Sequence, residues 1–358
     1  MPSFVMHEHT SPEAKADAAV ATLEAGRPRA DAVVASGVSK RFGSVLAVRD
    51  LSFTVPERCV AGLLGPNGAG KTTTIRMLAG VLAPDRGTLR VAGFDVAKDS
   101  EAARAAIGYL PESAPVHPEL RTREFLRYRA SLTGLFGRAA SNAIDRCVTA
   151  CDLGSVTGRL VGALSKGYRQ RVGVAAAMLS SPRVLILDEP SVGLDPHQLL
   201  AFRQLLRDLG KERTVLVSSH ILAEIEATCD RAILVAQGSI VAQGPIESLR
   251  AKAGDRYVVE GEGGDVRRAL SSLAELGSLT AEALDARWMR VTASAAAGTP
   301  DLREAIAADL AKAGIRVREL RRDRASLETL FVEATRTNAA REGQRGGQRD
   351  GNPGGVAA

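Results

Sequence analysis

The sequence predicts an α/β domain built on a parallel sheet, followed by a smaller α+β domain. Three observations support this fold class. The apolar run at residues 60–64 leads through a glycine-rich turn into a segment with helical spacing. A second apolar run, residues 184–187, ends in two carboxylates, as a strand buried on both faces of a parallel sheet does. After residue 249 the composition changes to short strand-like and helix-like segments, which indicates a second domain.

Length and composition agree with two domains. The 358 residues exceed a usual single domain and allow one large domain plus a smaller one. With 45% hydrophobic and 25% charged residues, the chain is able to bury a sizeable core. The net charge of +6 comes from scattered basic residues, so it is weak evidence for an anionic partner, and we expect no nucleic-acid partner. The four cysteines lack the paired spacing of a zinc site and fit a reducing compartment.

We expect the following organisation along the chain. Residues 1–30 form a disordered extension, and residues 336–358 form a disordered tail rich in Gly, Arg, Gln and Asn. The main domain covers residues 31–252, with a helix-rich insertion at about 113–180, and the accessory domain covers residues 255–335. No run approaches the ~18 apolar residues that cross a bilayer, and the first residues lack the order of a signal peptide. We therefore expect the chain to stay in the cytoplasm unless a partner anchors it.

The glycine-rich turn at residues 65–72 has the residue types of a phosphate-binding loop. Its glycines allow consecutive backbone N–H groups to face an anion, and the following helix presents its positive end to the same phosphates. Lys71 supplies a point charge for the β- and γ-phosphates, and the Thr72 hydroxyl is a Mg²⁺ ligand. A plain glycine-rich turn would need neither the lysine nor the flanking strand and helix. The expected nucleotide contacts are Gly65, Pro66, Asn67, Gly68, Ala69, Gly70, Lys71, Thr72 and Thr73.

Two acids and one histidine mark the ends of predicted strands. Either Asp188 holds Mg²⁺ through water while Glu189 polarises the attacking water, or both carboxylates are a solvated strand end. The first interpretation is favoured because a phosphate loop needs an acid that holds its metal. His220 follows the predicted strand at 214–217. A lone histidine is more often structural, but the place of His220 in this series favours contact with a γ-phosphate.

Two other positions complete the set of candidates. Phe42 lies in a turn-rich piece between two strand-like runs, where it either stacks on a base or belongs to the core. Ser165 is well placed as the N-cap of an amphipathic helix that continues to residue 179.

From about residue 33 to residue 249 the chain resembles the nucleotide-binding subunit of ATP-binding-cassette (ABC) transporters. The family's elements occur in order: the aromatic residue Phe42, the phosphate loop, the signature at 164–171, the acidic strand end, the turn at 191–195 and His220. Other phosphate-loop ATPases lack the signature, so the combination is highly specific. Residues 107–112 and 164–171 look like the branch that serves export-type (ABC-2-type) permeases.

The chain departs from the wider family at two places. Glu112 stands where the family usually has Gln, and the signature has Lys166 and Tyr168 where Gly and Gln are common. The phosphate-facing pair of the signature, Ser165 and Gly167, is intact. Because hard cations favour charged oxygen ligands, we expect Glu112 to join Thr72 and Asp188 around Mg²⁺.

The resemblance implies an ATPase that uses Mg²⁺. It implies a phosphate-loop fold with a helical subdomain and a head-to-tail dimer of identical or closely related subunits, which closes on two Mg·ATP. The dimer would drive a separate membrane permease, in the direction of export, from the cytoplasmic face of the membrane. In this interpretation Glu189, His220 and Lys71 are catalytic. The chain would be peripheral to the membrane.

Two rival functions remain at this stage. A soluble cassette ATPase acting on nucleic acid or ribosomes usually carries two cassettes or a long coiled coil, and neither is present in the sequence. A nucleotide sensor without enzymatic activity would lack the acid or the histidine, and both are in place. The sequence therefore favours the transporter subunit.

The accessory segment is expected to alternate strand, helix, strand, helix, strand. With a weak strand near 279–284, it approaches the arrangement of a ferredoxin-like module. A similar appendage often follows this branch of cassettes, so the resemblance implies a regulatory or dimer-supporting role. The alternative is a plain structural cap.

Overall fold

The computed structural model describes residues 30–113, 117–262, 265–296, 298–323, 326–328 and 330–331, with the backbone alone at residues 252 and 253. Apart from residue 30, the predicted N-terminal extension and C-terminal tail lie outside these residues. No helix among the described residues has the length and apolar character needed to span a membrane.

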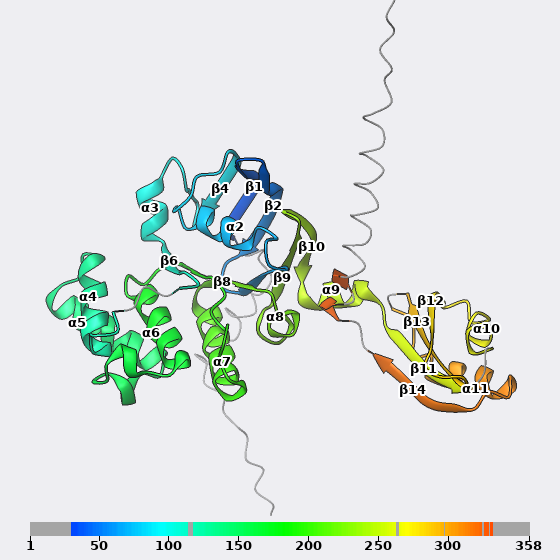
Figure 1. Cartoon of the computed structure of the whole chain (residues 1–358). Helices are drawn as coiled ribbons and strands as arrows, with labels where there is room; N and C mark the ends of the chain where they lie inside the picture. Colours follow the sequence, from blue (N-terminus) through cyan, green and yellow to red (C-terminus); the bar gives the residue numbers. More distant parts are fainter. Residues whose placement is uncertain are drawn as a thin grey trace, which may run out of the picture.

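A six-stranded sheet forms the centre of the main domain (Figure 1). Its order is β10-β9-β3-β8-β7-β6, and all its pairs are parallel except β10 with β9. The predicted α/β fold with a parallel sheet is therefore confirmed. The strands are β3 (Val60–Leu64), β6 (Ile107–Leu110), β7 (Val184–Leu187), β8 (Thr214–Ser219), β9 (Arg231–Ala236) and β10 (Ser239–Pro245).

An antiparallel sheet of order β2-β1-β4-β5 covers one face of the central sheet, with two helices. The two strand-like runs near Phe42 belong to one long hairpin, β1 (Asp31–Phe42) and β2 (Val45–Pro56). The remaining elements of this layer are β4 (Arg86–Val91), β5 (Phe94–Asp95), α2 (Lys71–Leu78) and α3 (Ser100–Ala105).

Helices cover the other face of the central sheet. Figure 1 shows α4, α5 and α6 grouped at one end of the main domain, with α7 and α8 beneath the strands. These helices are α4 (Thr122–Leu132), α5 (Gly137–Ala150), α6 (Lys166–Met178), α7 (Pro196–Glu212) and α8 (Leu222–Thr228), with 3-10 turns at Gly154–Val156 and Val161–Ala163.

The two layers explain why β7 is apolar along its whole length. Successive side chains of a strand point to opposite faces of the sheet. Val184 and Ile186 contact the core beneath the antiparallel sheet, whereas Leu185 and Leu187 contact the core formed with the helices. All four side chains are fully buried. The strand therefore holds the acids that follow it in a rigid position.

The cysteines contribute to these cores. The four cysteines are buried and form no disulfide, and all of them lie within the described residues. Burial raises the pKa of the Cys147 thiol to about 11, and it also raises the pKa of Cys229. The neutral thiol is therefore the stable form at physiological pH.

The accessory domain has a four-stranded antiparallel sheet of order β12-β13-β11-β14. The predicted weak strand is β12, and α10 and α11 pack on one face of the sheet. On the other face, Glu260 bonds to Arg318 and Arg290, and these bonds lower the pKa of its carboxyl. The elements are α9 (Ile246–Ala253), β11 (Arg256–Glu262), α10 (Val266–Leu270), β12 (Leu276–Ala283), β13 (Trp288–Ala295), α11 (Arg303–Lys312) and β14 (Val317–Asp323).

After β14 the chain returns to the main domain. Leu327 is fully buried in the core that contains the helices of the main domain, and its backbone N–H donates to Glu226 Oε1 at 2.5 Å. Leu330 and Phe331 pack against the same core. The predicted boundary had assigned these residues to the accessory domain, but their packing belongs to the main domain. The accessory domain is thus attached to the main domain at both ends.

We predict that Leu327→Ala destabilises the main domain by roughly 2–5 kcal/mol, because it leaves a cavity in a closed core. Leu200→Ala is the matched control, since Leu200 on α7 is 63% exposed and its loss should change stability by about 0.5 kcal/mol or less. The free energy of unfolding in urea measures both changes. Equal effects of the two substitutions would show that the returning segment contributes nothing to the core.

Candidate functional site

The phosphate loop joins β3 to α2 at the carboxyl edge of the central sheet, and its shape requires glycine at two positions. A Cβ on Gly65 would lie 2.2 Å from the carbonyl oxygen of Val235. Gly70, the N-cap of α2, has φ of 98°, and a Cβ there would lie 2.5 Å from the carbonyl oxygen of Ala47. Both contacts are with backbone, which cannot move aside. The glycines therefore keep the loop closely packed against β2 and β9.

Lys71 turns back over this loop. Its Nζ donates to the carbonyl oxygens of Gly65 at 2.8 Å and Pro66 at 3.2 Å. The same Nζ lies 3.3 Å from Glu189 Oε1, and the side chain of Lys71 is only 6% exposed. The ammonium group is thus held between the loop and the acidic end of β7, where it can neutralise a phosphate.

Asp188 and Glu189 are held by a hydroxyl from the neighbouring strand. Ser218 Oγ on β8 donates to Asp188 Oδ1 at 2.6 Å and accepts from the backbone N–H of Glu189 at 2.8 Å. Ser218, Asp188 and Glu189 are buried. The interpretation of these acids as a solvated strand end is therefore wrong.

The oxygen atoms beside the loop have the chemistry of a magnesium site. Thr72 Oγ1 donates to Asp188 Oδ1 at 3.4 Å, so a hydroxyl and a carboxylate adjoin at the start of α2. Within the described part of the chain no group of three His, Cys, Asp or Glu side chains is placed to hold a metal. Mg²⁺ commonly takes one or two carboxylates and completes its shell with water and phosphate oxygens. Thr72 and Asp188 fit that arrangement.

Glu189 has a strained backbone, and its side chain lies between Lys71 and His220. Its φ of 48° lies in the left-handed region, which costs a residue other than glycine of the order of 1–3 kcal/mol. Its Oε2 lies 2.9 Å from His220 Nδ1, whereas Lys71 contacts the other carboxylate oxygen, Oε1. The carboxylate is therefore aimed by three contacts: the two side chains and the backbone bond to Ser218.

The signature residues lie away from this cluster. Ser165 caps α6 by accepting from the backbone N–H of Tyr168 at 3.4 Å, and the N–H of Gly167 donates to Gln198 Oε1 at 3.0 Å. Figure 1 shows α6 and α2 on opposite sides of the central sheet. No hydrogen bond or ion pair in the described ranges joins Ser165 or Gly167 to the phosphate loop. One chain therefore does not bring the two motifs together.

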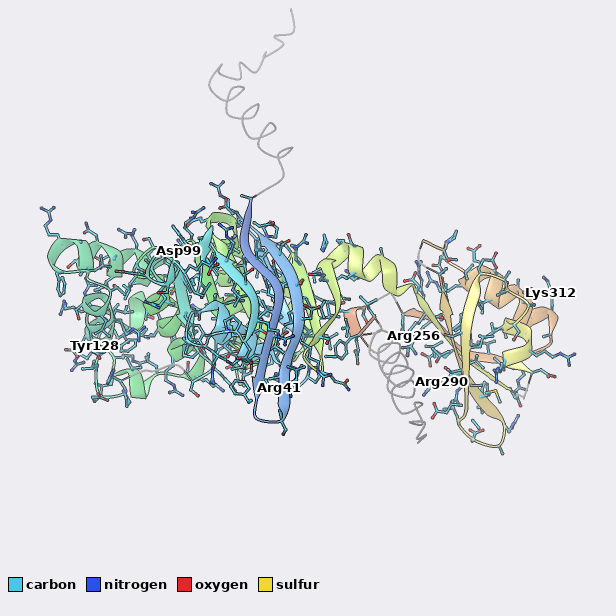
Figure 2. The ribbon with its side chains drawn as sticks, turned by 90° about the horizontal axis from the view of Figure 1, so that it is seen from above. Arg41, Asp99, Tyr128, Arg256, Arg290 and Lys312 are labelled. Atoms are coloured by element: carbon cyan, nitrogen blue, oxygen red, sulfur yellow. The ribbon has the colours of Figure 1, made fainter. Side chains whose placement is uncertain are left out.

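Phe42 and Glu112 are both exposed. Phe42, 49% exposed, ends β1 next to Arg41, which Figure 2 shows at the tip of the hairpin. The alternative that Phe42 belongs to the core is therefore wrong. Glu112 lies two residues after Leu110, whose carbonyl accepts from the N–H of Asp188 at 2.9 Å. Its backbone is at the carboxyl edge, but no described contact joins its side chain to Thr72 or Asp188.

Sequence reasoning missed three polar residues that support the site. Ser218 aligns both acids, Gln198 on α7 binds Gly167, and Glu224 on α8 accepts bonds from Ser191 and Ser219. Ser218 carried a weak signal, because a small polar residue at the end of an apolar strand lies at the edge where functional groups gather. Gln198 carried none, since its partner Gly167 comes from a distant segment, and Glu224 carried none, since its partner Ser191 is distant and its bond to the nearby Ser219 follows no sequence pattern.

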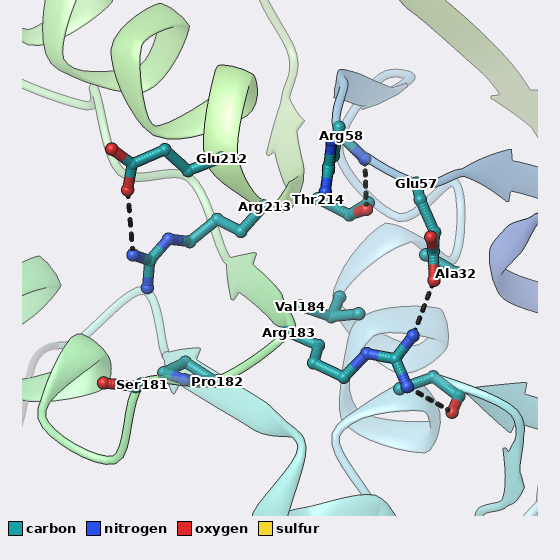
Figure 3. A pocket seen from close by; sticks show the side chains of 11 residues that line it. Ala32, Glu57, Arg58, Ser181, Pro182, Arg183, Val184, Glu212, Arg213 and Thr214 are labelled. Atoms are coloured by element: carbon teal, nitrogen blue, oxygen red, sulfur yellow. Dashed lines mark hydrogen bonds and ion pairs between the residues drawn. The ribbon is translucent and has the colours of Figure 1, made fainter. Parts of the chain in front are cut away.

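A cavity of about 370 Å³ lies at the opposite edge of the central sheet (Figure 3). Two ion pairs line it: Arg183 with Glu57 at 2.6 Å, and Arg213 with Glu212 at 3.4 Å. Val184 and Thr214, the first residues of β7 and β8, also line it, so it faces the amino ends of the strands. It is therefore separate from the phosphate loop and the acids.

Comparison with known proteins agrees with this geometry. The family model described as ABC transporter matches residues 48–192. The chain is 36% identical to the Nod factor export ATP-binding protein I of Burkholderia lata, over 69% of this chain and 83% of that protein. It is 33% identical to the daunorubicin resistance ATP-binding protein DrrA3 of Streptomyces coeruleorubidus, over 85% of this chain and 96% of that protein.

Two other matches cover different shares. The chain is 35% identical to the probable multidrug ABC transporter ATP-binding protein YbhF of Escherichia coli over 77% of its own length. The match covers only 48% of YbhF, so the chain spans about half of that protein. A solved ATP-binding subunit of an ABC transporter is 30% identical with a TM-score of 0.55, covering 61% of this chain and 91% of that one.

A phosphate loop facing two buried acids and a histidine is the arrangement of a nucleotide-binding α/β fold. The chain belongs to the family of ABC transporter ATP-binding proteins, whose members are ATPases. The predicted family is therefore confirmed.

We predict that Ser218→Ala lowers kcat for ATP hydrolysis at least about tenfold. The substitution leaves the buried N–H of Glu189 unpaired, which costs about 1–3 kcal/mol and loosens both acids. Thr214→Val is the matched control, because the Thr214 hydroxyl accepts from the Arg58 N–H at the far end of the same strand. That change should lower the melting temperature but leave kcat unchanged. If Ser218→Ala keeps the normal kcat, Ser218 does not align the acids.

Proposed function

We propose that the chain is the ATP-hydrolysing subunit of an export-type ABC transporter and acts on a separate membrane permease. The observation that carries the proposal is the position of the Glu189 carboxylate between Lys71 and His220, beside the phosphate loop. The names of the relatives, which include Nod factor export, bacitracin transport and daunorubicin resistance proteins, support the export direction. Neither the site nor the relatives favour a soluble ATPase acting on nucleic acid or ribosomes.

Each residue of the site has a distinct part in hydrolysis. Backbone N–H groups of residues 65–72 bind the phosphates, and Lys71 exchanges its carbonyl partners for the β- and γ-phosphate oxygens. Thr72 and Asp188 hold Mg²⁺, which neutralises charge on the phosphates when it is bound. Glu189 accepts a proton from the attacking water, and His220 holds that carboxylate in place and contacts the γ-phosphate.

The active site is completed by a second copy of the chain. A phosphate loop leaves one side of the γ-phosphate open, and the N-terminus of α6, with Ser165 and Gly167, suits that side. Since these residues are not near the loop of their own chain, a head-to-tail homodimer or a closely related heterodimer supplies them from the partner. Phe42, exposed at the end of its hairpin, is placed to stack on the adenine base.

The helical layer offers a surface for the permease. Tyr128, Leu132 and Phe136, on α4 and just after it, are 42%, 63% and 68% exposed, although all three are apolar or aromatic. Figure 2 shows Tyr128 at the outer side of this layer. We place the permease contact here, with the chain peripheral at the cytoplasmic face of the membrane. Glu112, which precedes this layer in the chain, either ligates Mg²⁺ or contacts the permease.

The accessory domain has a supporting role in this proposal. Its elements follow one another as strand, helix, strand, strand, helix, strand, which is the order of a ferredoxin-like module. Its attachment through α9 and Leu327 ties it to the helices behind the active site. We assign it a regulatory or dimer-supporting function.

We predict that Glu189→Gln still binds ATP but hydrolyses it roughly 100-fold more slowly or worse, because the amide cannot accept a proton from water. ATP should then accumulate a closed dimer, measured by size-exclusion chromatography beside the hydrolysis rate. Glu57→Gln is the matched control, since Glu57 pairs with Arg183 at the opposite edge of the sheet. Near-normal turnover by Glu189→Gln would remove Glu189 from the mechanism.

A further inference from the structure

Helix α8 carries a buried carboxylate directly behind the active site. Glu224 lies four residues after His220 and is 8% exposed. Burying a charged carboxylate is unfavourable unless polar partners surround it, so its position needs an explanation.

The partners of Glu224 come from two separate segments. Ser191 Oγ and Ser219 Oγ both donate to Glu224 Oε2, the second at 3.2 Å. Ser219 Oγ in turn accepts from the backbone N–H of Ile221 at 3.0 Å, which turns the chain into α8. A single oxygen atom thus joins the loop after β7 to the end of β8.

These two segments are the ones that carry the catalytic pair. Ser191 comes two residues after Glu189, whose backbone is in the left-handed region. Ser219 lies between Ser218, which binds the Glu189 N–H, and His220, which binds the Glu189 carboxylate. Glu224 thus bonds to both segments that carry the catalytic pair, although no hydrogen bond among the described residues joins it to Glu189 or His220 themselves.

The surroundings of Glu224 favour an ordered carboxylate. A cavity of about 20 Å³, enough for one water molecule, is lined by Glu224, Ser191 and Ser219. Arg203 of α7 lines the same cavity. Helix α8, which carries Glu224, is also bonded to the segment that returns from the accessory domain, since Glu226 accepts from the N–H of Leu327.

We propose that Glu224 is a positioning residue for ATP hydrolysis. It keeps the segment after Glu189 and the segment before His220 in register, so that the His220 contact aims the Glu189 carboxylate at the attacking water. The proposal rests on the hydrolytic function described above. It concerns the rate of the chemical step rather than the binding of nucleotide, because Glu224 is behind the acids and away from the phosphate loop.

The test compares Glu224→Ala and Glu224→Gln with the wild-type full chain. Glu224→Ala should lower kcat at least about tenfold and leave KM for ATP within about twofold, since only the step aimed by Glu189 is affected. Glu224→Gln should give a kcat between those of the wild type and Glu224→Ala, because its amide oxygen can replace Oε2 as the acceptor but lacks the negative charge that strengthens both bonds. Glu226→Gln is the matched control: it removes the same charge from the same helix, and it should lower the melting temperature without lowering kcat.

A double-mutant cycle separates positioning from general stability. Ser191→Ala should lower kcat alone but cause little further loss in the Glu224→Ala background, because both changes remove one interaction. If Glu224→Ala does not fold, the Ser191→Ala Ser219→Ala double variant and Glu224→Gln decide the question, and both should lower kcat. A normal kcat in these variants, additive losses, or an equal loss in Glu226→Gln would overturn the proposal. A wild-type chain that does not hydrolyse ATP would instead contradict the proposed function.

Discussion

The carboxylate of Glu189, shared between Lys71 and His220, is the contact on which the proposed active site depends. It joins the phosphate loop after β3, the acids after β7 and the histidine after β8. These three segments meet only because their strands are neighbours in a parallel sheet, whose carboxyl ends lie at one edge. The strained backbone of Glu189 is tolerated because Ser218 satisfies its N–H. Local strain at Glu189 is thus held by a hydrogen bond from the adjacent strand.

Rigidity at this edge comes from the layers on both faces of the sheet. The side chains of β7 alternate between two cores, so neither the strand nor the acids after it can shift without disturbing close packing. On the helical side, α8 lies between the active site and the returning segment of the accessory domain. Glu224 faces inward to Ser191 and Ser219, while Glu226 faces outward to Leu327. The helix is therefore a physical connection between the catalytic edge and the accessory domain.

The parts of the site that the sequence predicted are those whose chemistry is local. Residues 65–72 need glycine for close backbone approach, and the two acids directly follow an apolar strand. Both features can be predicted from neighbouring residues in the sequence. Ser218, Glu224 and Leu327 depend on partners 29 to 101 residues away at Glu189, Ser191 and Glu226, and no local pattern indicates such pairs. Phe42 was ambiguous because an aromatic residue near a strand suits the core as well as the surface, and its exposure decides between them.

In the proposed dimer, each active site combines the phosphate loop of one chain with Ser165 and Gly167 of another. The most direct measurement mixes Lys71→Ala chains with Ser165→Arg chains and follows ATP hydrolysis. Each variant alone should be inactive, and a heterodimer should regain one intact site, giving roughly a quarter of the wild-type rate in an equal mixture if the sites act independently. If the mixture stays inactive while its chains still associate, hydrolysis takes place within one chain and the composite site is wrong.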